Sequence, residues 1–212
     1  MKIRYLGHAC FEVTSQSGVK VITDPYTKVG YELPKGLTAD ILTISHGHFD
    51  HNFTQAIDAN HLVNKDGEYS IEGVEIRGVL SYHDAHMGAL RGENVIYIVK
   101  MDGVTWCHMG DIGEECSEEL AEEIGRIDLL FVPVGGTYTI DGLGAKKYIE
   151  RLQPKVVLPM HYKPEDGALD IADAQSFLNL YPTEKVTYID NGVVELDEKT
   201  KGIIYMKRVK NV

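Results

Sequence analysis

The sequence predicts an α+β fold in which β-sheets pack on each other and a few helices cover them from outside. Short runs of β-branched and aromatic residues, bounded by turn residues, recur along the chain and outnumber the segments with helical periodicity. Because each sheet must bury a face, this mixture is typical of packed sheets with outer helices. With 212 residues and no Pro/Gly/Ser-rich linker, we expect one domain over residues 1–212.

The first part of the chain is expected to contain strands only. Three strands are predicted at Lys2–Leu6, Cys10–Thr14 and Val19–Asp24. Asp40–Ser45 is a short apolar run of the kind that is buried on both faces of a sheet, and it stops at His46. Two hairpins follow, over Glu68–Ser81 and Asn94–Met109, because Glu72-Gly73 and Asp102-Gly103 are good turn pairs.

The second part mixes helices with strands. Helices are predicted at Ser117–Ile124, Ala145–Leu152 and near Ile171–Leu180. Ser117 is suited to cap the first of them. Strands are predicted at Asp128–Val134, Lys155–Met160, Val186–Asp190, Val193–Leu196 and Ile203–Lys207.

Composition disfavours several classes of partner. Lys and Arg number 21 against 32 Asp and Glu, so the formal net charge is −11, which repels nucleic acid and anionic membranes. We find no signal-peptide pattern and no apolar run long enough for a membrane span. The three cysteines, Cys10, Cys107 and Cys116, match neither a disulfide framework nor a CxxC pair. We therefore expect a cytoplasmic protein with a small-molecule substrate, and its oligomeric state stays open.

The strongest chemical signal is the segment His46-Gly47-His48-Phe49-Asp50-His51. It offers four metal-binding side chains within six residues, and a tight loop, with Gly47 relaxing the backbone, lets them point toward two positions. Imidazole suits Zn²⁺, Mn²⁺ or Fe²⁺, and one carboxylate among histidines fits a catalytic rather than a structural site. The alternative, a solvated polar turn, explains this density of ligands poorly.

Three further candidates lie just past predicted strand ends, where sites are usually built: His83, Asp111 and His161. Each has an alternative. His86 offers a second histidine beside His83, Asp111 fits a Gly-Asp turn, and His161 fits a packed core histidine.

The motif HxHxDH after a buried strand resembles the signature of the metallo-β-lactamase superfamily, whose fold is a four-layer αβ/βα sandwich of two mixed β-sheets. The resemblance runs through Thr23-Asp24-Pro25, His83, Gly110-Asp111 and Pro159-Met160-His161-Tyr162. The chain is most similar to the compact cytoplasmic branch that includes the ascorbate-6-phosphate lactonase-like proteins, as Gly92-Glu93-Asn94 and Pro133-Val134-Gly135-Gly136 also suggest.

This resemblance implies a centre with two divalent ions, Zn²⁺ first, with Mn²⁺ or Fe²⁺ as alternatives. The implied ligands are His46, His48 and His83 for one ion and Asp50, His51 and His161 for the other, with Asp111 bridging both. A water held between two such ions loses a proton near neutral pH and attacks the substrate. Asp50 and Asp111 then take part in catalysis through the metals. The expected activity is hydrolysis of an ester, lactone or phosphodiester of a small molecule.

Two other functions are alternatives to hydrolysis. A mononuclear iron dioxygenase can use the same fold, although flavin-linked di-iron members carry Glu where this chain has His48. A non-catalytic metal-binding protein would be free to lose some ligands, whereas this chain keeps the full set.

Weaker candidates surround the implied centre. Asp24 is predicted to orient a ligand, with an Asp-Pro turn as the alternative. His8 is predicted at the rim of the cleft, or as an ordinary loop residue, and Tyr138 as a residue that touches substrate. His108 and Asn94 are assigned to the core or to strand pairing, with a supporting role behind the metal ligands as the alternative.

Overall fold

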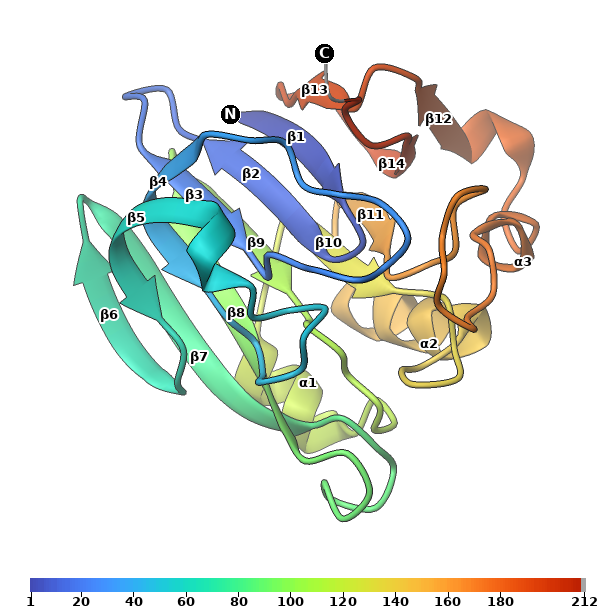
Figure 1. Ribbon diagram of the computed structural model, residues 1–212. Helices are drawn as coiled ribbons and strands as arrows, with labels where there is room; N and C mark the ends of the chain where they lie inside the picture. The colour runs from blue at the N-terminus through green and yellow to red at the C-terminus, as the bar shows by residue number, and fades with distance from the viewer. Residues whose placement is uncertain (211–212) are drawn as a thin grey trace.

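The computed structural model describes residues 1–210, and its strands form two mixed sheets that pack face to face (Figure 1). The six-stranded sheet has the order β13 (Val193–Glu195), β1 (Lys2–Gly7), β2 (Cys10–Thr14), β3 (Lys20–Thr23), β4 (Leu37–Thr43) and β5 (Ile57–Val63). Strands β3, β4 and β5 are parallel, whereas β13, β1, β2 and β3 pair antiparallel.

The eight-stranded sheet has the order β12 (Val186–Ile189), β14 (Gly202–Met206), β11 (Val156–Met160), β10 (Leu129–Pro133), β9 (Val104–His108), β8 (Glu93–Met101), β7 (Val74–Tyr82) and β6 (Gly67–Ile71). Its first five strands are parallel and its last four pair antiparallel. Both hairpins turn where the sequence predicts, at Glu72-Gly73 and Asp102-Gly103, and all four turn residues have a positive φ. Such turns match the twist of the paired strands.

The main core lies between the two sheets. Phe11 of β2 and Phe131 of β10 are both fully buried, and their ring centroids lie 4.5 Å apart. Trp106 of β9 packs its ring against Phe131 from within the second sheet, at 5.7 Å. These aromatic side chains bury large apolar areas, and they fix how the two sheets sit on each other.

Three helices pack against the same core from the outer side of the eight-stranded sheet: α1 (Glu118–Ile124), α2 (Gly142–Leu152) and α3 (Gln175–Leu178) (Figure 1). Ser117 caps α1 as predicted, because its hydroxyl accepts the Leu120 N–H at 3.0 Å. Asp141 caps α2 in the same way, so α2 begins three residues before its predicted start at Ala145. No helix within residues 1–210 is long and apolar enough to cross a membrane.

The outer face of the six-stranded sheet is covered differently. Tyr26, Val29 and Leu33, from the irregular segment 24–36, are buried against Ile22 and Leu42 and form a second apolar cluster. This layer is therefore a packed loop in place of a helix. The short 3-10 turns Thr54–Ala56 and Thr183–Lys185 complete the described elements.

The structure contains one strand that was not predicted from the sequence, and one helix is shorter than predicted. Among residues 1–210, β5 pairs only with β4 and is therefore an edge strand. Most of its side chains are exposed, so its sequence shows no apolar alternation. The helix predicted near Ile171–Leu180 is the single turn α3, whose start lacks a side-chain cap. Val193–Glu195 joins the first sheet beside β1, away from its chain neighbour β12.

Candidate metal centre

The loop that carries the histidine motif follows β4. It folds into a tight turn in which the backbone N–H groups of His51 and Asn52 both donate to the His48 carbonyl, at 3.0 and 3.1 Å. Gly47 was expected to relax this loop, but it does not have a positive φ, and a Cβ added there would meet no atom within 4 Å. The turn therefore does not depend on glycine at this position.

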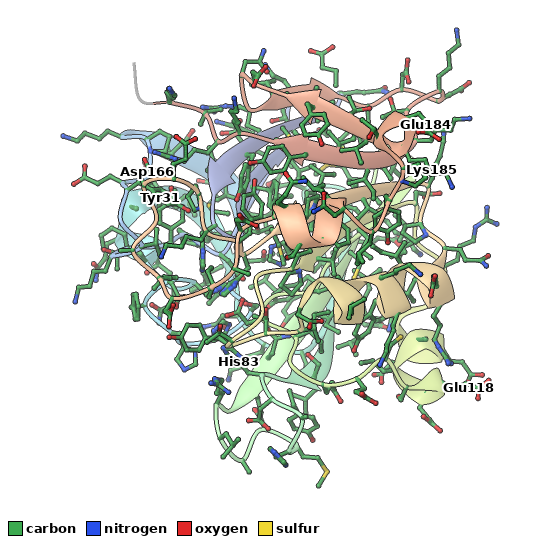
Figure 2. The ribbon with its side chains drawn as sticks, turned by 90° about the vertical axis from the view of Figure 1, so that its right-hand side faces the viewer. Tyr31, His83, Glu118, Asp166, Glu184 and Lys185 are labelled. Atoms are coloured by element: carbon green, nitrogen blue, oxygen red, sulfur yellow. The ribbon has the colours of Figure 1, made fainter. Side chains whose placement is uncertain are left out.

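Three imidazoles form a first group. The ring centroids of His46 and His48 lie 4.7 Å apart, and His83, which follows β7, lies 4.7 Å from His46 and 5.0 Å from His48. One nitrogen of each ring lies within 4.8 Å of the others. Figure 2 shows His83 well away from Glu118, the first residue of α1.

A second group lies beside the first. Asp50, His51, His161 and His8 each offer one donor atom, and these atoms lie within 4.8 Å of one another. His161 directly follows β11, and its backbone N–H donates to the His8 carbonyl at 3.0 Å. Chain segments far apart in sequence thus meet at one end of the strands.

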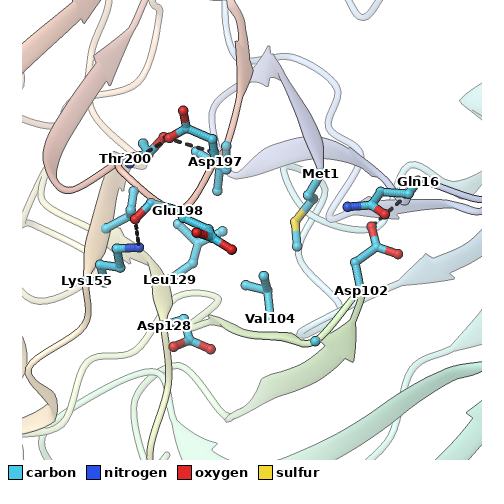
Figure 3. A pocket seen from close by; sticks show the side chains of 13 residues that line it. Met1, Gln16, Asp102, Val104, Asp128, Leu129, Lys155, Asp197, Glu198 and Thr200 are labelled. Atoms are coloured by element: carbon cyan, nitrogen blue, oxygen red, sulfur yellow. Dashed lines mark hydrogen bonds between the residues drawn. The ribbon is translucent and has the colours of Figure 1, made fainter.

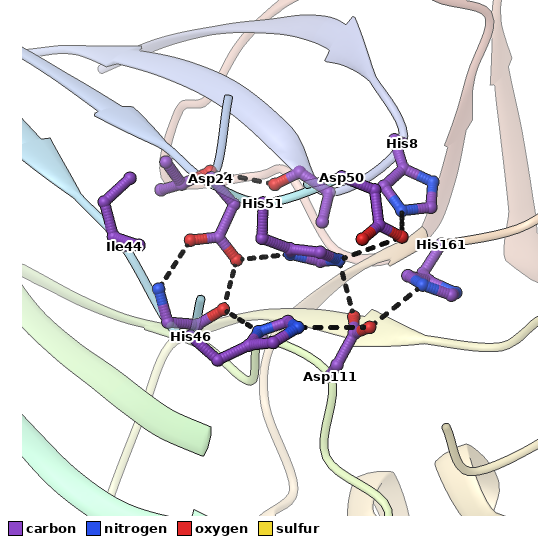
Figure 4. A network of polar contacts seen from close by, with 12 residues as sticks. His8, Asp24, Ile44, His46, Asp50, His51, Asp111 and His161 are labelled. Carbon is purple, nitrogen blue, oxygen red and sulfur yellow. Dashed lines mark hydrogen bonds and ion pairs between the residues drawn. The ribbon is translucent and has the colours of Figure 1, made fainter. Parts of the chain in front are cut away.

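Asp111, three residues past the end of β9, lies between the two groups (Figure 4). Its Oδ2 is 3.3 Å from His83 Nε2, 3.1 Å from His161 Nε2 and 3.8 Å from His46 Nε2. Its Oδ1 is 3.0 Å from His51 Nε2. All seven residues that the motif analysis named therefore converge.

Buried groups behind the histidines hold them in place. Asp24 is fully buried, and one of its oxygens lies 2.8 Å from His51 Nδ1. The Ser45 hydroxyl donates to the same carboxylate at 2.5 Å and lies 3.0 Å from His46 Nδ1. Because Asp24 engages Nδ1 of His51, the Nε2 atom is left facing Asp111.

Asn94, at the start of β8, supports the Asp111 loop. Its Oδ1 accepts the Asp111 N–H at 2.9 Å, and its Nδ2 donates to the Met109 carbonyl at 2.9 Å and to Ser81 Oγ at 2.8 Å. For Asn94 this corresponds to the alternative kept beside a core or strand-pairing role, whereas Ser45 was not predicted to take part. The position of Ser45 directly before His46 was the one sequence signal for its role. Asn94 is distant from Asp111 in sequence and reaches it across the sheet, so no sequence spacing indicates that contact.

Close backbone approaches at two glycines let the ligand-bearing loops meet. A Cβ on Gly113 would lie 2.5 Å from the His83 carbonyl group. A Cβ on Gly135, which follows β10, would overlap the His161 carbonyl oxygen. Side chains at these two positions would push the loops of His83 and His161 outward.

The centre is charged unevenly. Burial opposes a charge on His51, but the carboxylates of Asp111 and Asp24 outweigh it and raise the His51 pKa well above its usual value. Burial, together with the neighbouring His51, lowers the pKa of His46 to about 3. Burial likewise opposes ionisation of Asp111, yet the imidazoles of His161 and His51 hold its pKa well below the usual range. His46 and the carboxylate of Asp111 are thus ready to bind a cation at neutral pH.

Several buried polar atoms in the described chain point at one another without a hydrogen bond: Nε2 of His46, His51 and His161, and Oδ1 of Asp111. Leaving such atoms unpaired in a protein interior is costly. A divalent cation satisfies imidazole nitrogens and carboxylate oxygens together, so the donor set fits metal binding.

The weaker candidates are placed differently from one another. Of the two histidines left open, His83 joins the donors, whereas His86 is exposed on the following loop. His8 was expected at the cleft rim or in an ordinary loop, but it is buried, because the left-handed backbone at His8 turns its ring inward. Tyr138 is 36% exposed and lies under the Arg91 guanidinium, 5.4 Å from its ring centroid.

A hollow of about 300 Å³ lies at the opposite ends of the strands (Figure 3). It is lined by Leu129 and Val156, the first residues of β10 and β11, whereas the donors follow the last residues of the strands. Its Asp102 and Asp128 carboxylates already accept backbone N–H groups from Gln16 and Thr105. Among the described residues, none of the groups of donors that could hold a metal ion lies in this hollow.

The chain is similar to proteins of one superfamily. A family model described as "Beta-lactamase superfamily domain" matches residues 2–161. A UPF0173 metal-dependent hydrolase from Thermococcus onnurineus is 30% identical, covering 87% of this chain and 98% of the relative. The crystal structure of a proposed Zn-dependent hydrolase of the metallo-β-lactamase superfamily from Thermotoga maritima has 34% identity and a TM-score of 0.82, covering 99% of each chain.

A more distant structure shares the fold alone. The diiron β-hydroxylase CmlA from Streptomyces venezuelae is 16% identical with a TM-score of 0.57, covering 76% of this chain and 44% of that protein.

Proposed function

Because the chain belongs to the metal-dependent hydrolases of the metallo-β-lactamase superfamily, we propose that it hydrolyses an ester, lactone or phosphodiester of a small molecule with two divalent cations. The observation that supports this most is the convergence of two donor groups on Asp111, whose two oxygens lie 3.0 to 3.8 Å from four imidazole nitrogens.

The two groups suggest how the donors are shared. His46, His48 and His83 would hold one cation and Asp50, His51 and His161 the other, with Asp111 between them. Zn²⁺ is the cation we propose first, since imidazole and carboxylate donors suit it, and Mn²⁺ and Fe²⁺ accept the same donors. When bound, the cations supply Lewis acidity, which lowers the pKa of a water and polarises the scissile group.

The protein's own residues then hold this arrangement. Asp24 accepts the Nδ1–H of His51, so that Nε2 is the nitrogen turned toward the proposed cation. Asn94 fixes the backbone of Asp111 and thereby the direction of its carboxylate. A cysteine nucleophile is not part of the proposal, because burial raises the pKa of the Cys10 and Cys107 thiols and keeps them protonated.

The same donors argue against the other functions considered. A mononuclear iron dioxygenase needs one set of donors, whereas two sets meet here. A purely structural metal site is usually closed and rich in cysteine, but His48 is exposed and the three described cysteines lie elsewhere. We therefore propose the dinuclear hydrolase over both.

The proposed setting is the cytoplasm, and the proposed substrate is a small molecule. A net charge of −11 repels nucleic acid, so we expect no appreciable binding of duplex DNA at physiological salt. Salt-sensitive binding in a gel-shift assay would contradict this expectation.

The test combines metal analysis with substrates. Purified protein is expected to hold two ions per chain and to hydrolyse at least one member of a panel of lactones, phosphodiesters and carboxylic esters. Asp111→Asn keeps the shape of the side chain but removes its charge. We expect it to lose about 100-fold or more in activity, beyond the roughly 10- to 100-fold typical for a residue outside the ligand set.

Cys116→Ser is the control, since Cys116 is the most accessible thiol and is not part of the centre. Its activity is expected to equal that of the parent protein. Full activity in chelator-treated protein, or a trapped acyl-cysteine, would overturn the proposal.

A further inference from the structure

His8 occupies a position that its sequence context does not reveal. It follows Gly7 at the turn between β1 and β2, and its own φ is 53°, in the left-handed region. Three contacts fix its backbone: its N–H donates to the Tyr31 hydroxyl at 3.1 Å, and its carbonyl accepts from His161 N–H at 3.0 Å and from the Tyr5 hydroxyl at 3.1 Å. A residue other than glycine held in this backbone region often marks a functional constraint.

The side chain of His8 is 1% exposed and points at Asp50, His51 and His161, the other members of the second donor group (Figure 4). Its ring centroid lies 4.2 Å from that of His161 and 5.1 Å from that of His51. Its Nε2 lies 3.2 Å from Asp50 Oδ2. A carboxylate only accepts hydrogen bonds, so Nε2 of His8 carries the proton in this contact.

This contact separates His8 from the cation donors. The Nε2 atoms of His51 and His161 are buried without a hydrogen bond, and they face the Asp111 carboxylate that lies between the two donor groups, at 3.0 and 3.1 Å. The Nε2 of His8 is instead engaged by Asp50. A nitrogen that carries a proton has no lone pair in the ring plane to offer to a metal.

We propose that His8 is a positioning residue of the metal centre, which donates a hydrogen bond to one oxygen of Asp50 and leaves the other oxygen for the second cation. The inference rests on the two-ion centre proposed above. The hydrogen bond restricts the rotation of Asp50 and lets the carboxylate bind without an unpaired oxygen. The anchored backbone of His8 also ties this carboxylate to the loop of His161, so two donors of one cation share a support.

The experiment measures cation binding rather than turnover. Metal-free parent protein, His8→Leu and His8→Gln are titrated with Zn²⁺ against a chromophoric chelator, and their Co²⁺ forms are compared by visible absorption. The amide N–H of Gln can take the place of the His8 donor, but its oxygen binds Zn²⁺ poorly, whereas Leu offers neither. His86→Ala, on the exposed loop, is the matched control.

We expect His8→Leu to bind the second cation about 10- to 100-fold more weakly and the first cation unchanged. His8→Gln should recover most of that loss and keep the parent Co²⁺ spectrum. Equal affinity of His8→Leu and the parent for both cations would overturn the inference. So would a His8→Gln protein that is as weak as His8→Leu while its circular dichroism stays native, since His8 would then itself be a ligand. A parent protein that binds only one cation would instead refute the two-ion centre.

Discussion

Single side chains of the centre differ in how they hold protons before a cation arrives. His46 and His8 are neutral at pH 7, because burial lowers their pKa values to about 3 and about 4. His51 is the exception, since two carboxylates stabilise its charge against burial and raise its pKa. A cation that takes Nε2 of His51 must therefore displace a proton, whereas one that takes Nε2 of His46 does not.

The affinity for a divalent cation is accordingly expected to rise with pH across the neutral range. His51 has a raised pKa in the folded, metal-free protein, so its proton competes with the cation below that pKa and the competition fades as pH rises through it. Chelator competition between about pH 6 and about pH 8 measures the slope, and calorimetry in two buffers counts the released protons. Affinity that does not change with pH would contradict a protonated His51.

The sequence could identify the donors themselves but not most of the residues that hold them. His46, His48, Asp50 and His51 stand in one motif, and the structure brings them together with Asp111. Asn94 and Ser45 act through hydrogen bonds between distant segments, and such partners have no spacing that a sequence can display. His8 was named, yet its burial depends on a left-handed turn that no local pattern specified.

At the level of elements, the ends of the strands determine the site. His83 and His161 each directly follow the last residue of a strand, and the loops that bear them come together where Gly113 and Gly135 have no side chain. Rigid strands place these loops more reliably than the loops could place themselves.

Alanine substitutions of two glycines near the donors should therefore differ in their effect on stability and metal binding. Gly135→Ala forces a Cβ into the His161 carbonyl, and we expect it to cost about 1–3 kcal/mol of stability, as overpacking does. It should also weaken cation binding. Gly47→Ala, inside the histidine motif, places its Cβ in open space and should leave metal content and melting temperature unchanged. Metal analysis and thermal unfolding of both variants test this expectation. A Gly135→Ala protein with unchanged metal content and melting temperature would refute the proposed packing.

Elements with local signals were predictable, and those that depend on distant partners were not. The turns Glu72-Gly73 and Asp102-Gly103 and the cap Ser117 are encoded within a few residues. The edge strand β5 presents polar residues such as Asp58 and Asn60, and it pairs with β4 at the edge of its sheet. Its pairing, like that of β13 beside β1, arises from the tertiary fold.

Across the whole molecule, the two sheets share one core. Side chains from both, such as Phe11 and Phe131, belong to a single buried cluster that also takes in residues of α1, α2 and α3. The second cluster, under the segment 24–36, lies on the other face of the six-stranded sheet and shares its strands. Because both sheets contribute side chains to the main core, the packing supports the proposal of one domain.

The metal-free protein is therefore expected to unfold in one cooperative transition, with equal calorimetric and van't Hoff enthalpies. Because the cations bind only the folded centre, a free cation concentration of about 100 times Kd should add about 2.7 kcal/mol for each cation bound. For a chain of this size that raises the melting temperature by about 5 to 11 °C. Phe131→Leu, which loosens the contact between the sheets, should lower the melting temperature without splitting the transition, because each sheet depends on the other. Two separate calorimetric peaks, of which only one responds to the cation, would show that the sheets unfold independently.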